Sequence, residues 1–241
     1  MSGDLTVVDG AATGVWIAPR LEGGFGGKVK QQVPSSYDAY VRIFHPASDR
    51  DGDLVTWTEV AKALGRTAHR EMQWHKLVGS SDPFGMSGSE WPGGIPATGE
   101  LDSASLEALL CVLAGHTPNP EYCLFGLSTI FAGVDEAFPT AIQLRFPGRD
   151  YVVFSGPLSA ANQVGYELSA GKFDPASRWT QSPNLIWPSD HSWYVASEYD
   201  LDSTLVGGSR ELIDAIMAAR QLETWEVERD DSLEDDADKI N

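Results

Sequence analysis

Apolar residues recur at helical spacing in three stretches of the chain, each with a capping residue in front of it. The clearest stretch begins with Thr56 and Glu59, which form a capping box, and ends at Gly65. It predicts a helix over residues 57–64. The same pattern predicts a second helix that begins after Asp102 or Ser103 and a third that follows Ser209.

Elsewhere the pattern changes to alternation or to short apolar runs, which are typical of β-strands. These runs are Val15–Ile17, Tyr40–His45, Tyr122–Leu127, Ala141–Phe146, Tyr151–Phe154, Asn184–Trp187, Ser192–Ser197 and Thr224–Val227. A short helix is expected at Leu158–Leu168, and long Gly- and Pro-rich loops, above all 79–99, separate the elements. Because strands and helices follow without regular βαβ alternation, the sequence predicts an α+β fold. About three to four helices would pack on a mostly antiparallel sheet.

The composition is that of an ordinary globular chain, with 42% hydrophobic and 22% charged residues among 241. We expect one α+β domain over residues 1–226 and an acidic C-terminal tail over residues 227–241. From Glu223 to Asn241 the chain has nine acidic and two basic residues. Such a segment has little apolar surface to offset the entropy of ordering, so the tail is predicted to be solvated and partly mobile.

The charge balance narrows the range of partners. There are 17 basic and 35 acidic residues, which gives a formal net charge of −18, and the basic residues form no run. Nucleic-acid backbones and anionic membrane surfaces need concentrated Lys and Arg, so neither is an expected partner, whereas a basic protein is. No stretch approaches the roughly 20 apolar residues that span a bilayer, and the N-terminus lacks the pattern of a signal peptide. We therefore expect a cytoplasmic protein.

Motifs that would hold a metal or cofactor are incomplete. Asp49, Asp51 and Asp53 have the spacing of a calcium loop, but the glycine and the glutamate that complete such a loop are missing. His69 and Glu71 match one half of a zinc deaminase site, and the cysteine pair of the other half is absent. We expect no metal and no cofactor.

Two cysteines are too few for a disulfide framework. Cys111 and Cys123 are expected to be small buried hydrophobic residues.

The segment Pro183–Ser209 combines large aromatic side chains with carboxylates and a histidine. Its candidate binding residues are Trp187, Asp190, His191, Trp193, Tyr199 and Asp202. Aromatic rings beside carboxylates could form a binding hot spot or a platform on which a carbohydrate stacks. In the structural alternative, Trp193, Val195 and Ser197 alternate into a sheet core, and Asp202 begins a turn.

This segment also takes part in a resemblance to known proteins. Together with Val33–Pro46, Phe146–Tyr151 and Asp238–Asn241 it resembles a family of uncharacterised actinobacterial proteins, nearly from end to end. Pro34–Tyr37 and the acidic composition are similar to SUKH immunity and scaffold domains. That second resemblance implies an acidic, cytoplasmic α+β protein that binds a partner.

Three functional hypotheses follow from these observations. The leading one is a non-enzymatic protein-binding module of the immunity type that engages a basic partner. The first alternative is a small hydrolase that uses His191 with Asp190 or Asp202. The second is a carbohydrate- or small-ligand-binding domain that uses Trp187 and Trp193. The sequence does not determine the oligomeric state.

Overall fold

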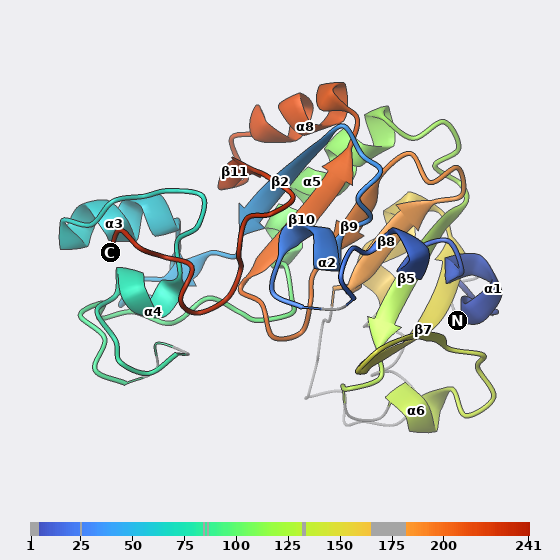
Figure 1. The fold of residues 1–241 in the computed structure, drawn as a ribbon, viewed down its shortest axis with the longest axis horizontal. Helices are drawn as coiled ribbons and strands as arrows, with labels where there is room; N and C mark the ends of the chain where they lie inside the picture. The colour runs from blue at the N-terminus through green and yellow to red at the C-terminus, as the bar shows by residue number, and fades with distance from the viewer. Residues whose placement is uncertain (1–4, 25, 84, 86, 132–133, 165–181) are drawn as a thin grey trace.

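An antiparallel sheet forms the centre of the fold (Figure 1). The computed structural model describes residues 5–24, 26–83, 85, 87–131, 134–164 and 182–241. The strands of the sheet lie in the order β1 (Thr6–Val8), β7 (Arg149–Gly156), β5 (Cys123–Ser128), β8 (Leu185–Pro188), β9 (Tyr194–Ala196), β10 (Ser203–Gly208), β2 (Ala39–Phe44) and β11 (Thr224–Val227), with β6 (Leu144–Phe146) also beside β7. β3 (Ala47–Ser48) and β4 (Leu54–Val55) form a separate hairpin.

Helices cover both faces of this sheet. On one face, α5 (Ser103–Gly115), α8 (Arg210–Met217) and the 3₁₀ helix Leu158–Gln163 pack over a core that includes Val41, Val152 and Trp193. On the other face lie α1 (Gly10–Gly14), the 3₁₀ helix Ala18–Arg20 and α2 (Val29–Gln32), around a core that includes Tyr151 and Trp187. The α+β prediction is confirmed.

A third apolar cluster lies beyond β2. There α3 (Trp57–Leu64) and α4 (Trp74–Leu77) pack around Phe44, Trp57 and Met72 (Figure 1). With α6 (Val134–Ala137), the described residues contain seven α-helices rather than three or four. The additional helices have only four or five residues, too few to show a helical period in the sequence. No helix within the described ranges is long and apolar enough to cross a membrane.

The capping signals locate the three long helices correctly. Thr56 and Glu59 form the predicted capping box of α3, and Gly65 ends that helix with φ 67°. The Asp102 carboxylate accepts hydrogen bonds from two amides in the first turn of α5. The Ser209 hydroxyl accepts a hydrogen bond from the amide of Leu212 in α8. Caps depend only on neighbouring residues, so the sequence shows them directly.

Strand β10 is where the prediction fails most clearly. The sequence predicts a turn that begins at Asp202, whereas the structure has a fully buried strand, Ser203–Gly208, between β9 and β2. The segment Ser203–Gly208 has few large apolar side chains to mark it as a strand. Gly207 is needed because a Cβ there would come within 2.7 Å of the side chains of Tyr37 and Val33.

Two further predictions change in the structure. Residues 15–17 are not a strand; they follow helix α1, and the N-terminal strand is instead β1. Only the first part of the expected helix at 158–168 is observed, as a 3₁₀ helix, because residues 165–181 lie outside the described part of the chain.

The C-terminal segment is docked rather than solvated. Lys28 and Ser232 form an antiparallel bridge, and the Leu233 amide donates to the Gly27 carbonyl at 2.6 Å. Leu233 is 4% exposed. The Asn241 side chain exchanges two hydrogen bonds with the backbone of Thr67, beside α3. The expectation of a solvated tail after residue 226 is therefore wrong, because this segment finds backbone and apolar partners that composition does not reveal.

Candidate functional site

The two tryptophans of the predicted site do not form a surface platform. Trp187 and Trp193 are both 0% exposed, and they belong to the cores on opposite faces of the sheet. The Trp193 indole Nε1 donates to Thr117 Oγ1 at 3.0 Å. The structural interpretation is correct for residues 193–197, since Trp193 and Val195 share one core and Ser197 is buried against Thr204.

Asp190 and His191 lie in the turn after β8 but do not form a catalytic pair. The Asp190 carboxylate accepts hydrogen bonds from the Ser192 amide at 3.1 Å and the Ser192 hydroxyl at 2.8 Å. The His191 ring stacks on Trp16, with 4.1 Å between ring centroids. Burial, aided by the positive charge of Arg20, lowers the pKa of His191. Within the described residues no carboxylate is hydrogen-bonded to its ring.

Asp202 is also separated from His191. Its carboxylate faces Arg42 at the start of β10, with 3.4 Å between Asp202 Oδ1 and Arg42 Nη2. The candidate hydrolase residues are therefore not brought together by the fold.

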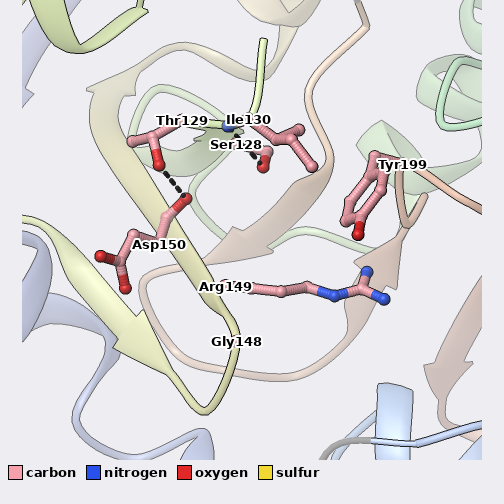
Figure 2. Close-up of a pocket in the computed structure, with 7 residues that line it drawn as sticks. All are labelled: Ser128, Thr129, Ile130, Gly148, Arg149, Asp150 and Tyr199. Carbon is pink, nitrogen blue, oxygen red and sulfur yellow. Dashed lines mark hydrogen bonds between the residues drawn. The ribbon is translucent and has the colours of Figure 1, made fainter.

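Tyr199 is the predicted residue that lines a cavity. The cavity has a volume of about 330 Å³ and lies between the end of β5 and the β6–β7 turn. It is lined by Ser128, Thr129, Ile130, Gly148, Arg149, Asp150 and Tyr199 (Figure 2). Its size is at the lower end of the range of small-ligand pockets.

Arg149 forms the floor of the cavity beside Tyr199. Gly148, with φ 82°, makes the tight turn that starts β7 and sets the direction of Arg149. The guanidinium forms ion pairs with Glu198 and with Asp200, the latter at 3.1 Å. It also lies over the Tyr199 ring, 4.7 Å from the centroid. These contacts hold the arginine in one orientation.

The buried hydroxyl of Tyr151 also holds Glu198 in place. The Tyr151 hydroxyl lies 2.9 and 3.0 Å from the two carboxylate oxygens of Glu198, to which it donates. The Glu198 side chain is 2% exposed. Burial raises the pKa of Tyr151 well above its ordinary value, so its hydroxyl remains a donor at all physiological pH values.

The opposite wall of the cavity is formed by residues that follow β5. Thr129 Oγ1 donates to the Asp150 carbonyl at 3.2 Å, and Ser128 Oγ accepts from the Ile130 amide at 3.3 Å. Ile130 is 55% exposed and adds an apolar surface. Figure 2 shows that the Asp150 carboxylate points away from Arg149 and Tyr199.

The charged side chains among the lining residues are Arg149 and Asp150, one of each sign. Glu198 and Asp200 do not line the cavity, but both form ion pairs with Arg149. The Glu198 carboxylate is buried, while the Asp200 side chain is 49% exposed. The guanidinium that faces the cavity is therefore already paired with two carboxylates.

Sequence reasoning missed Arg149, Glu198 and the hydroxyls of β5. Arg149 lies between two predicted strands, Ala141–Phe146 and Tyr151–Phe154, and its partner Glu198 is distant along the chain. One signal was available, because Glu198 and Asp200 flank Tyr199 on a segment already marked as rich in aromatic and acidic residues.

The cysteines have different environments. Cys123 is buried, and burial raises the pKa of its thiol to about 12. Cys111 is exposed on α5, so the prediction that both are buried is wrong for this residue. In the described part of the chain, no group of three or more His, Cys, Asp or Glu residues could hold a metal ion.

Comparisons of the chain with protein families, with curated proteins and with solved structures found no match. The resemblances to the actinobacterial family and to SUKH domains therefore stay predictions.

Proposed function

We propose that this protein is a non-enzymatic binding module for a basic protein partner. The proposal is carried by one observation: the most acidic segment of the chain is held in a fixed position on the folded body. We call residues 228–238 the acidic strap. It contains seven acidic residues and one arginine.

Ion pairs and several backbone bonds anchor the acidic strap, and its Arg229 and Asp238 pair with Glu22 and His69. Asp230 pairs with Lys30 at 2.6 Å, and Asp231 pairs with Arg70 at 3.0 Å. The backbone of the strap is hydrogen-bonded to α2 at Val29 and Lys30. The strap is therefore a continuous part of the surface beside β11.

Other carboxylates of the strap are left to face a partner. Glu228, Glu234 and Asp235 are exposed, and no salt bridge among the described residues includes them. Carboxylates that are already positioned cost little ordering entropy when a basic surface docks. They also speed the encounter with a positively charged protein. The resemblance to SUKH immunity domains implies the same kind of activity.

The test compares two sets of charge-neutralising substitutions with a fluorescein-labelled decalysine peptide as probe. The strap variant carries Glu228→Gln, Glu234→Gln and Asp235→Asn. The matched control carries Asp51→Asn, Asp53→Asn and Glu107→Gln, which are exposed residues elsewhere. Both variants lose the same charge.

We expect the strap variant to bind the probe about tenfold more weakly, because three surface charges at about 0.5 kcal/mol each sum to that factor. The control should change affinity by less than about threefold, and salt should weaken all binding. Equal losses in both variants would show that only the net charge matters. Failure of the peptide to bind the native protein would reject the proposed function.

A further inference from the structure

The cavity beside Tyr199 has a lining that suits a neutral ligand rich in hydroxyl groups. We propose that it binds a single monosaccharide or a cyclic polyol of similar size. This binding goes beyond the docking of a basic partner, because the residues that line the cavity do not belong to the acidic strap.

The charges at the cavity favour neither an anion nor a cation. Arg149 and Asp150 are the charged residues of the lining, and the Asp150 carboxylate points away from Arg149 and Tyr199 (Figure 2). An anion would have to compete with Glu198 and Asp200, which already pair with the Arg149 guanidinium. A cation would approach that same guanidinium and be repelled by it. A neutral ligand meets neither obstacle.

Three side chains of the lining carry hydroxyls, and together they supply donors and acceptors. Ser128 is 2% exposed, and its hydroxyl accepts from the Ile130 amide at 3.3 Å, which leaves its own proton to donate. Thr129 Oγ1 donates to the Asp150 carbonyl at 3.2 Å, so its lone pairs remain to accept. Tyr199 adds a phenol hydroxyl, which can donate or accept. A sugar hydroxyl is itself both a donor and an acceptor, so a ring that carries several of them can pair with all three.

Two apolar surfaces complete the lining, and they suit the carbon skeleton of such a ring. Ile130 is 55% exposed, and its side chain extends toward the Tyr199 ring (Figure 2). The Arg149 guanidinium lies 4.7 Å from the centroid of that ring and holds it in place. The C–H groups of a ligand can therefore pack on Ile130 and Tyr199 while its hydroxyls bond to the polar side chains. The volume of about 330 Å³ suits one ring rather than a chain of sugars, because it is at the lower end of the range for small-ligand pockets.

The first experiment titrates ¹⁵N-labelled native protein with D-glucose, D-galactose, D-mannose and myo-inositol. Cyclohexanol supplies a ring without the set of hydroxyls, inorganic phosphate supplies an anion, and methylammonium supplies a cation. We expect at least one of the polyols to cause saturable shifts of the amides of Ser128, Thr129, Gly148 and Tyr199. Cyclohexanol should bind at least about tenfold more weakly, because it leaves the hydroxyls of the lining unpaired. The inference is overturned if no polyol shifts these amides, or if any of the three control compounds binds as tightly as the best polyol.

The second experiment removes one hydroxyl at a time and repeats the titration with the polyol that binds best. Ser128→Ala and Tyr199→Phe should each weaken binding about three- to tenfold, which corresponds to the loss of one hydrogen bond. The matched controls are Ser155→Ala, at a buried serine of β7, and Tyr122→Phe, at an exposed tyrosine, and both should bind like the native protein.

Equal affinities of the site variants and their controls would reject the site. If Ser128→Ala does not fold, Tyr199→Phe decides the result, because it keeps the ring and removes only an oxygen. The decalysine titration tests the proposed function separately, so either proposal can fail while the other stands.

Discussion

Two arginines lie buried beside carboxylates, each on the second strand from one end of the sheet, and they differ in the groups that surround them. The side chain of Arg42, on β2, is 1% exposed, and that of Arg149, on β7, is 8% exposed. Each lies over an aromatic ring, Phe44 and Tyr199 respectively. The two arginines are therefore buried to a similar degree, and each contacts an aromatic ring.

The partners of Arg42 include the backbone. Its guanidinium donates to the carbonyls of Met72 at 3.1 Å and Arg70 at 3.3 Å, and to the hydroxyl of Ser203 at 2.8 Å. The side chain of Arg70 in turn holds Asp231 of the acidic strap. Arg42 therefore connects the sheet, the segment before α4 and the strap.

Arg149 has a different environment, because it lines the cavity. Water or a ligand can approach it there without unfolding the chain. The comparison teaches that a buried ion pair can serve two purposes. The ion pair of Arg42 holds separate parts of the fold together. The ion pair of Arg149 orients an arginine that lines a cavity.

The largest expected effect is that of Arg42→Ala. The substitution leaves Asp202 without its counter-charge and two carbonyls without donors, so the free energy of unfolding should fall by roughly 3–5 kcal/mol. Urea unfolding measures it. Arg220→Ala, at an exposed arginine, is the control and should change stability by less than about 0.5 kcal/mol. A loss below about 1 kcal/mol for Arg42→Ala would remove the distinction between the two arginines.

The buried surroundings of Arg42 include His45, and they predict that the stability of the protein depends on pH. Burial lowers the pKa of His45 to about 4, and the nearby Arg42 contributes in the same direction. The His45 Nδ1–H donates to the Ala97 carbonyl at 2.8 Å, and Nε2 accepts from the Thr204 hydroxyl at 2.8 Å. The folded protein therefore keeps this ring neutral.

The unfolded chain has the ordinary histidine pKa of about 6.5, so it takes up the proton first as the pH falls. The stabilisation is complete above about pH 6.5 and is lost progressively toward pH 4, by up to about 3 kcal/mol. Urea unfolding of His45→Gln should show a flatter pH profile in this window than the native chain. His116→Gln should retain the native profile, and a flat native profile would contradict the prediction.

Leu233→Ala tests whether the acidic strap contributes to the stability of the fold, as the contacts around Arg42 do. Leu233 is 4% exposed, so its truncation should cost about 2–3 kcal/mol of stability. Ile240 is 60% exposed, and Ile240→Ala is the matched control with little expected effect. Thermal unfolding of both variants would measure the difference. Equal melting temperatures for the two variants would show that the strap is solvated, as its composition suggests.

The smallest effect is expected for Arg149→Ala. The buried Glu198 loses its counter-charge, but it keeps the hydrogen bond from the Tyr151 hydroxyl, and water can enter the space that the arginine leaves beside the cavity. Asp200 is already 49% exposed, so the loss of stability should be about 1–2 kcal/mol. The measurement is the same urea titration used for Arg42→Ala. A loss as large as that of Arg42→Ala would show that Arg149 is equally structural and would weaken the case for a site.

The sequence shows contacts between neighbouring residues but not contacts between distant ones. The capping box of Thr56 and Glu59 and the cap at Ser209 were readable because each involves residues three positions apart. The Arg149–Glu198 pair was not readable, because the two residues are separated by 49 positions and meet only through the order of strands. Of the candidate site residues, Tyr199 lines the cavity and the tryptophans are in the cores.

The sequence by itself determined the three long helices with their caps, the α+β class and the excess of acid, since each depends on neighbouring residues or on composition. Only the tertiary structure decided that Ser203–Gly208 is a central strand, that Leu233 docks the acidic strap, and that Arg149 faces a cavity. The physical reason is that burial and charge pairing depend on contacts between distant residues. A polar or glycine-rich segment can become a core strand when its neighbours supply the apolar surface, and an acidic segment can be ordered when lysine and arginine lie opposite.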